Sequence, residues 1–212
     1  MWRPRILLAD DHVLLLDAFT KLLETEYEIA GVFADGRTLL DEAPKLKPHV
    51  IILDISMPLM NGLEAARQLK RKLPDVKLIF VTVNHDPDLA AEAFRIGGSA
   101  YLLKSAAASE LFRAIEDVLA GRSYISPAMT QGMIESLAHP TRTHTRAGCL
   151  TSRQSEVLQL LAEGHSMKQT AAILGITPRT VAYHKYVMME QLGIKSTAEL
   201  VQFAVKHGII SG

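Results

Sequence analysis

The sequence predicts an α/β domain with a parallel sheet, followed by a small all-helical domain. Two observations lead to this fold class. Through about residue 122, short β-rich runs alternate five times with amphipathic helical periods, whereas after residue 148 only helical periods occur. Repeated βα units of this length are typical of a doubly wound sheet with helices on both faces. Between the two regions, HPTRTHTRAG at 139–148 has the composition of a linker. We therefore expect domains at 1–125 and 149–212, joined by a helical extension and linker at 126–148.

The composition is that of an ordinary globular protein. The 212 residues are 48% apolar, and the formal net charge is zero. Residues 1–125 carry 15 Lys or Arg against 18 Asp or Glu, and residues 150–212 carry 6 against 4, a weak sign of different partners. Cys149 is the single cysteine, which excludes an internal disulfide and fits a reducing compartment. No apolar run suits a signal peptide or a transmembrane helix, so we expect a soluble, cytoplasmic protein without a membrane partner.

Each element of the first domain has its own signature. Three of the five β-rich runs are apolar almost throughout, as expected for strands covered by helices on both faces. Gly121 is expected to end the last helix. The expected strands are 5–10, 29–34, 50–55, 77–83 and 100–104, and the expected helices are 13–23, 38–46, 63–73, 89–96 and 108–121. The chain lacks a GxGxxG motif, so nucleotide binding has no support.

Capping signals mark four short helices in the second domain. Thr151, Ser166 and Ser196 each precede a Gln or Glu by three positions, which is the pattern of a capping box. Thr177 precedes a proline that suits the first helical position. The expected helices are 152–163, 167–174, 178–191 and 197–207. The second and third are joined by the tight turn LGIT, so we expect a helix-turn-helix whose second helix enters a major groove.

Charged and polar side chains follow the strands of the first domain. In chain order they are Asp10, Asp11, Asp54, Thr82 and Lys104. Because the carboxyl ends of parallel strands open at one edge of the sheet, these side chains should meet. Converging carboxylates repel one another unless a cation lies among them, and oxygen ligands suit Mg²⁺. One carboxylate could then act as a nucleophile and form an acyl phosphate, whose oxygens Lys104 and Thr82 would hold.

The motifs LLADDH, LDISMPLMNG, VTV and AYLLKS resemble the receiver domain of two-component response regulators in order, spacing and strand placement. The resemblance covers about residues 4–122 and implies a flavodoxin-like fold with five parallel strands in the order 2-1-3-4-5. It also implies that Asp54 is the phosphoacceptor and that the phosphoryl group comes from a sensor histidine kinase.

The same resemblance implies roles for the other pocket residues. Asp11, Asp54 and the Ser56 carbonyl would ligate Mg²⁺, with Asp10 in the outer sphere, and Lys104 would bind the phosphoryl group. Thr82 and Tyr101 would form a switch pair, in which the hydroxyl moves to the phosphoryl group and the ring turns inward behind it. Many receivers have a proline in a cis peptide after the lysine, but Ser105 stands here. The sequence leaves the conformation of that peptide open, because a cis bond before a residue other than proline is costly.

Residues 150–200 resemble the LuxR-type DNA-binding domain, and the whole chain resembles a response regulator of the NarL/FixJ type. The family implies binding to double-stranded DNA as a homodimer formed on activation. The last helix would supply the dimer contact through Val201, Ala204 and Val205, although such spacing is equally typical of a domain's own core. The candidate DNA contacts are Thr177, Arg179, Thr180, Ala182, Tyr183, Lys185 and Tyr186. Position 182 is commonly lysine in the family and position 186 often basic or polar, so the salt dependence of binding should be reduced.

Competing functions differ in what they require of the pocket. An aspartyl phosphatase of the haloacid-dehalogenase kind needs a second carboxylate two residues after the nucleophile, where this chain has Ser56, so we do not expect an enzyme. An atypical regulator that binds DNA constitutively, with a vestigial pocket, is the remaining alternative. The complete set of acidic and basic residues favours a phosphorylation-controlled transcriptional regulator.

Overall fold

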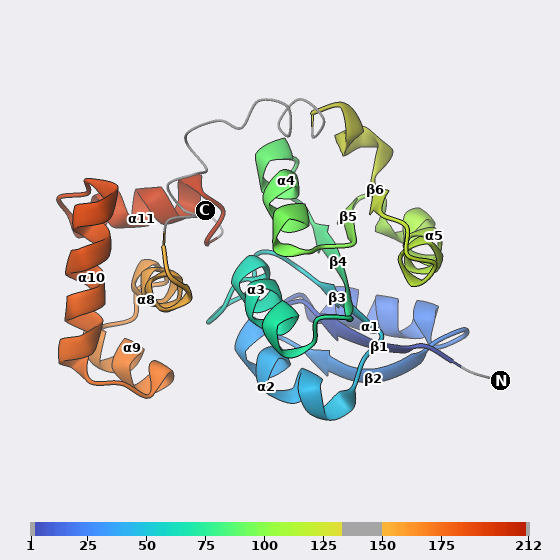
Figure 1. The fold of residues 1–212 in the computed structure, drawn as a ribbon, viewed down its shortest axis with the longest axis horizontal. Coiled ribbons are helices and arrows are strands. Elements are labelled where there is room, and N and C mark those ends of the chain that lie inside the picture. The colour runs from blue at the N-terminus through green and yellow to red at the C-terminus, as the bar shows by residue number, and fades with distance from the viewer. Residues whose placement is uncertain (1–2, 133–149, 211–212) are drawn as a thin grey trace.

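A six-stranded parallel sheet organises the first part of the chain in the computed structural model, which describes residues 3–132 and 150–210 (Figure 1). The strands are β1 (Arg5–Ala9), β2 (Glu28–Phe33), β3 (Val50–Leu53), β4 (Lys77–Thr82), β5 (Ala100–Leu103) and β6 (Tyr124–Ile125). They lie in the order β2-β1-β3-β4-β5-β6, and all neighbouring strands pair in parallel. The expected linker at 139–148 lies outside the described residues.

The order predicted for the first five strands is confirmed, but the sheet has a sixth strand that the sequence pattern does not predict. β6 has only two residues, which lie beside Ala100 and Tyr101 of β5. Its position is fixed by the next residue, Ser126, whose hydroxyl accepts the Leu103 N–H at 3.2 Å and donates to the Glu110 carboxylate at 2.5 Å. A strand of two residues is too short to show periodicity, so only these tertiary contacts reveal it.

Helices cover both faces of the sheet, which explains why its central strands are apolar throughout. The helices α1 (Val13–Leu23) and α5 (Ala107–Leu119) pack on one face. The helices α2 (Gly36–Leu46), α3 (Gly62–Lys72) and α4 (Pro87–Ile96) pack on the other. Alternate residues of β3 belong to the two cores, Ile51 to one and Ile52 to the other.

The second unit contains four helices within the described residues: α8 (Ser152–Ala162), α9 (Met167–Leu174), α10 (Pro178–Leu192) and α11 (Thr197–Lys206). A 3₁₀ turn, η1 (Pro127–Met129), follows β6. The capping boxes expected at Thr151 and Ser166 are both complete. At Ser196 the box is incomplete, because Glu199 accepts the Lys195 N–H instead of the Ser196 N–H. None of the described helices has the length and apolarity needed to cross a bilayer.

The two units meet where α8 contacts the loop that follows β3 (Figure 1). Gln159 binds this loop at two points: its amide N–H donates to the Met57 carbonyl at 2.8 Å, and its amide oxygen accepts the Asn61 N–H at 2.7 Å. The side chain of Leu59, at the tip of the loop, packs against the core of the helical unit. The Gln68 amide donates to Glu156 at 2.8 Å beside it. The helical unit therefore holds the loop that begins directly after Asp54.

Gly62 provides a stability test of this loop. Its N–H donates to the Ile55 carbonyl at 2.8 Å, and a Cβ atom at this position would overlap the carbonyl oxygen of Asp54. We expect Gly62→Ala to lower the free energy of unfolding of the α/β unit by about 2–3 kcal/mol, measured by urea unfolding. The control is Gly121→Ala, where φ is +79° but the space is open, with an expected loss of about 1 kcal/mol. Equal losses of stability in the two variants would show that overlap with the Asp54 carbonyl oxygen does not cause the destabilisation.

Candidate functional sites

An acidic pocket lies at the carboxyl edge of the sheet, as the sequence predicts. Asp10 follows β1, Asp54 follows β3 and Lys104 follows β5. The ammonium of Lys104 lies 2.6 Å from Asp10 Oδ2 and 2.9 Å from Asp54 Oδ2. Both carboxylates are buried, with 4% and 3% of their surface exposed. Three strand ends far apart in the sequence therefore form one buried charge cluster.

The backbone fixes the position of Asp54. Its N–H donates to the Ala9 carbonyl at 2.8 Å, which continues the ladder between β1 and β3. Its Oδ1 atom accepts the Ile55 N–H at 2.7 Å, so its Oδ2 atom turns toward Lys104. Burial raises the pKa of the Asp54 carboxyl, against the opposing hydrogen bond and charge of Lys104.

Lys104 is held by backbone and side-chain contacts. Its N–H donates to the Thr82 carbonyl at 2.8 Å. Burial alone would lower the pKa of its ammonium, but the hydrogen bonds and charges of Asp10 and Asp54 outweigh burial and raise that pKa. The described residues contain no cis peptide, so the bond from Lys104 to Ser105 is trans. The lysine thus reaches both carboxylates without the cis bond that the sequence left open.

The pocket also contains a residue that was not among the predicted ligands, His12. One ligand atom from each of Asp10, Asp11, His12 and Asp54 lies within 4.8 Å of the others. His12 Nδ1 lies 3.0 Å from Asp10 Oδ1 and 2.9 Å from Asp11 Oδ1. The sequence signal that could have indicated His12 was its place in the motif LLADDH, directly after the two aspartates. The donor set is dominated by carboxylate oxygens, which fits a hard divalent cation.

The proposed switch residues lie together beside the pocket. Thr82 ends β4 fully buried, and its hydroxyl accepts the Asn84 N–H at 3.2 Å. Tyr101 is also fully buried, and its hydroxyl donates to the Asn84 carbonyl at 3.1 Å. Burial, with the charges of Asp86 and Asp54, raises the pKa of the Tyr101 phenol, which keeps it a neutral donor. The ring is therefore turned inward in this structure, and Asn84 links both side chains.

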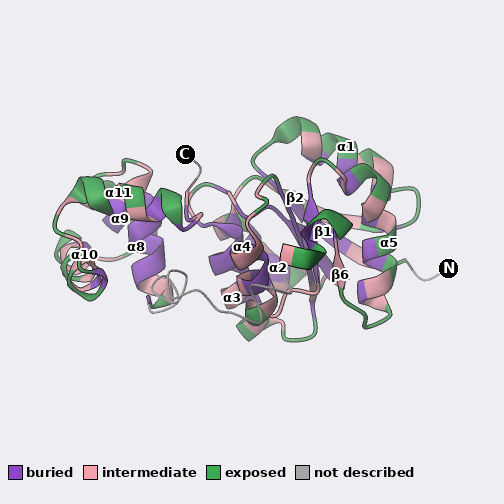
Figure 2. Cartoon of the chain, turned by 90° about the horizontal axis from the view of Figure 1, so that it is seen from above, coloured by how far each residue is buried: buried purple, intermediate pink, exposed green. Residues whose placement is uncertain are grey.

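The candidate DNA-binding helix α10 presents an exposed face. Val181 and Met188 are fully buried on its inner side, whereas Tyr183 and Tyr186 on the outer side are 64% and 65% exposed. Both views place α8 between α10 and the α/β unit, so the outer face of α10 is turned away from the sheet (Figures 1 and 2). The α/β unit therefore leaves this face uncovered.

The other candidate DNA contacts differ in exposure and in hydrogen bonding. Arg179 is exposed near the start of α10, and Ala182 is half-buried at its side. The hydroxyls of Thr177 and Thr180 bond to each other at 2.9 Å while Thr177 caps the helix. Lys185 donates to the Thr197 hydroxyl at 2.9 Å, an engagement that the sequence does not predict.

The candidate dimer residues of α11 differ in exposure. Ala204 is completely buried in the core of the helical unit, which corrects its assignment as a contact between copies. Val205 is 40% exposed, and Val201 is half-buried. One side of the helix thus packs into its own domain, and Val205 lies on the exposed side together with Gln202 and Lys206.

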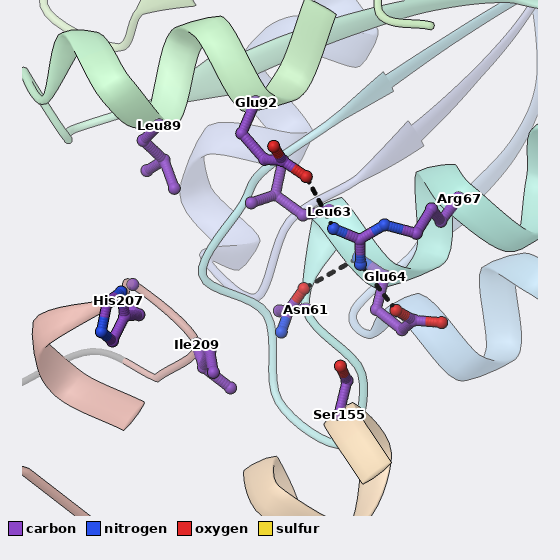
Figure 3. Close-up of a pocket in the computed structure, with 10 residues that line it drawn as sticks. Asn61, Leu63, Glu64, Arg67, Leu89, Glu92, Ser155, His207 and Ile209 are labelled. Atoms are coloured by element: carbon purple, nitrogen blue, oxygen red, sulfur yellow. Dashed lines mark hydrogen bonds and ion pairs between the residues drawn. The ribbon is translucent and has the colours of Figure 1, made fainter. Parts of the chain in front are cut away.

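A separate narrow cavity of about 50 Å³ lies between the two units (Figure 3). Leu63 and Leu89 line it from the α/β unit, and His207 and Ile209 line it from the helical unit. Arg67 lies in this cavity between Glu64 and Glu92, at 2.9 and 2.8 Å from their carboxylates (Figure 3). Arg67 therefore partly offsets the two carboxylates of this cavity, and Arg95 also pairs with Glu92, at 2.8 Å.

Known proteins match both parts of the chain. Residues 6–116 match the family model of the response regulator receiver domain, and residues 149–204 match that of the luxR family of bacterial regulatory proteins. The chain is 32% identical over 208 residues to the response regulator GacA of Pseudomonas aeruginosa, covering 97% of each chain. It resembles a solved structure of the RcsB response regulator of Salmonella typhimurium with a TM-score of 0.64, at 27% identity, covering 98% of this chain and 99% of that chain. It also resembles RcsB in a structure of two dimers bound to two parallel DNAs, with a TM-score of 0.61, at 26% identity, covering 97% and 99%.

The charge cluster predicts how stability responds to a cation. Lys104→Met would leave Asp10 and Asp54 buried without a countercharge, so we expect it to lower the free energy of unfolding by roughly 3 kcal/mol in a chelating buffer. A divalent cation should restore most of this loss, because it replaces the missing positive charge. The measurement is urea unfolding with EDTA and with MgCl₂. The control is Lys72→Met, since the Lys72 ammonium donates to the Leu40 carbonyl, at 3.5 Å, and forms no ion pair among the described residues. A loss that MgCl₂ leaves unchanged would contradict the expected cation site.

Proposed function

Because the chain belongs to the response regulators, with a receiver domain and a LuxR-type DNA-binding domain, we propose that it is a transcriptional regulator controlled by phosphorylation of Asp54. The observation that carries the proposal is the buried Asp54 carboxylate, paired with Lys104 at 2.9 Å and grouped with Asp10 and Asp11. The proposed domain boundaries are 1–125 and 149–212, with the helical extension and linker at 126–148.

The residues present suit a magnesium ion, which would neutralise charge on the phosphoryl oxygens when bound. Asp11, Asp54 and the Ser56 carbonyl would hold it, with Asp10 in the outer sphere. An oxygen of the Asp54 carboxylate attacks phosphorus and forms the acyl phosphate, while the bond from phosphorus to the donor breaks and the donor leaves. Lys104 then binds a phosphoryl oxygen in place of the carboxylate, since its ammonium already lies 2.9 Å from Asp54.

The response to phosphorylation passes through Thr82 and Tyr101. A phosphoryl group at Asp54 offers an acceptor to the Thr82 O–H, and movement toward it displaces the oxygen that now accepts the Asn84 N–H. Tyr101 bonds the same residue through the Asn84 carbonyl. Movement of the Thr82 hydroxyl therefore alters the conformation of the loop that leads into α4. This loop is the two-state element that such a switch requires.

A sensor histidine kinase is the proposed donor, within a cytoplasmic signalling pathway. Apolar side chains are exposed beside two of the strand ends that form the pocket. Val13 and Leu14 follow the acidic motif and are 64% and 86% exposed, and Val83 follows Thr82 and is 67% exposed. Exposed apolar side chains of this size at the mouth of a pocket suit a transient protein contact. They support delivery of the phosphoryl group by a docked protein.

The proposed target is double-stranded DNA, read by α10. Its exposed tyrosines and Arg179 are free to face a groove, because the receiver domain does not cover them. The related RcsB has been solved as dimers on DNA. We extend this arrangement to the present chain, with a homodimer formed on activation and Val201 and Val205 of α11 at the contact.

The first prediction concerns the phosphoacceptor. With acetyl phosphate and MgCl₂, the wild-type protein should show a mobility shift on a phosphate-affinity gel, and Asp54→Asn should show none. The matched control is Asp35→Asn, because Asp35 also follows a strand but caps α2 outside the pocket. It should shift like the wild type. A folded wild-type protein that never shifts, even with phosphohistidine donors, would favour the constitutive regulator with a vestigial pocket.

The second prediction concerns the DNA interface. Binding of a short mixed-sequence duplex should weaken in Arg179→Ala, and the slope of log affinity against log salt should fall by about 0.9, the value for one lost phosphate contact. Tyr183→Ala should weaken binding without changing that slope, because its ring carries no charge. Fluorescence anisotropy at several salt concentrations measures both. Gln202→Ala, an exposed change on α11, is the control. Unchanged affinity in both α10 variants would contradict this reading face.

A further inference from the structure

The phosphorylation site borders a cavity whose walls come from both domains. This open cavity has a volume of about 320 Å³. Asp11 and Ser56, two of the proposed metal ligands, line it from the receiver domain. Ala162, Glu163 and Ile210 line it from the DNA-binding domain. A carboxylate from the second domain therefore faces the same space as the proposed metal ligands.

Glu163 is held in this position by directional contacts. Its two carboxylate oxygens accept the Leu59 N–H at 3.2 and 3.4 Å, and the amide of Gln159 donates to Oε1 at 2.7 Å. Gln159 is itself bound to the Met57 carbonyl and the Asn61 N–H. Leu59, at the tip of this loop, has a left-handed backbone with φ +63° and packs against the DNA-binding domain. The carboxylate is 19% exposed, so its charge is fixed beside the cavity.

The charge around the cavity is negative. The Lys104 ammonium is occupied by Asp10 and Asp54, at 2.6 and 2.9 Å, and does not line the cavity. The two carboxylates that line the cavity each have an imidazole nearby. His12 Nδ1 lies 2.9 Å from Asp11, and His165 Nε2 lies 3.6 Å from Glu163. The charged side chains that line the cavity are the carboxylates of Asp11 and Glu163, and they dominate its field. Such a field attracts a divalent cation and repels a dianionic phosphate.

We propose that Glu163 is a specificity-determining residue of the phosphorylation site, contributed by the DNA-binding domain, that disfavours dianionic acyl phosphates as donors relative to monoanionic phosphoramidates. The inference rests on the proposed phosphorylation of Asp54. In either reaction an Asp54 oxygen forms the new bond to phosphorus. The bond from phosphorus to oxygen breaks with acetyl phosphate, which releases acetate, and the bond from phosphorus to nitrogen breaks with phosphoramidate, which releases ammonia. Phosphohistidine transfers its phosphoryl group by breaking the same kind of bond, from phosphorus to nitrogen.

The test compares initial rates of phosphoryl incorporation from acetyl phosphate and from phosphoramidate, at pH 7, low salt and saturating MgCl₂. Glu163→Gln removes the charge but keeps an oxygen that accepts the Leu59 N–H. It should raise the ratio of the acetyl phosphate rate to the phosphoramidate rate by about two- to fourfold, the effect of one nearby charge in a solvated cavity. Added salt should reduce this gain, because it screens the charge.

Glu156→Gln is the matched control. Glu156 lies on α8, the helix that Glu163 directly follows, and contacts the receiver domain through Gln68, but it does not line the cavity. This variant loosens docking without changing the cavity's charge, so its rate ratio should equal that of the wild type. An unchanged ratio in Glu163→Gln, or the same change in both variants, would overturn the proposal.

A second readout is independent of phosphoryl transfer. Affinity for Mn²⁺, measured by electron paramagnetic resonance, should fall by about two- to fourfold in Glu163→Gln and stay unchanged in Glu156→Gln. If the wild type accepts phosphate from neither donor, the proposed role of Asp54 fails. The donor preference fails with it, whereas equal Mn²⁺ affinities in Glu163→Gln and wild type would overturn the charge effect of Glu163 by itself.

Discussion

The ion pairs that bind the Lys104 ammonium to Asp10 and Asp54 are the interaction on which the rest of the site depends. Removing these charges from water costs several kcal/mol for each ion. Mutual attraction at 2.6 and 2.9 Å offsets that cost, together with the backbone N–H groups that donate to both carboxylates. The parallel sheet makes this possible, because it brings the ends of β1, β3 and β5 to one edge. Under the proposed phosphorylation, the same cluster allows Asp54 to be both buried and reactive. Its charge is compensated by a group that can transfer to a phosphoryl oxygen when one arrives.

The loop after Asp54 connects this chemistry to the second domain. Residues 57–61 bind α8 through Gln159 and Glu163, while the recognition helix α10 faces away from the receiver (Figure 1). The domain contact therefore does not act by covering the reading face. It joins the DNA-binding domain to the backbone that supplies the Ser56 carbonyl. If phosphorylation weakens this domain contact, then by thermodynamic linkage the contact disfavours phosphorylation by the same free energy.

The sequence predicts the two domains, the first five strands, and the pocket residues Asp10, Asp54 and Lys104, because each depends on local periodicity or on position at a strand end. The order of these strands was implied by the resemblance to receiver domains. The features that the sequence did not predict have a different origin. β6 and the burial of Ala204 depend on tertiary packing, which a two-residue run or a helical stripe does not encode. The contacts of Glu163 join residues about a hundred positions apart, so no local pattern indicates them. His12 belongs to the motif, but the two adjacent aspartates alone were enough to predict a cation site there.

The central claim is that one carboxylate, Asp54, forms the acyl phosphate. The most direct measurement is to treat the phosphorylated full-length protein with borohydride, which reduces an aspartyl phosphate to homoserine, and to locate that residue by peptide mass spectrometry. The account predicts homoserine at position 54 alone, because Asp54, directly after β3, holds the position of the phosphoacceptor in the receiver domain that this region matches. Homoserine at position 10 or 11, or its absence from a protein that carries phosphate, would contradict it.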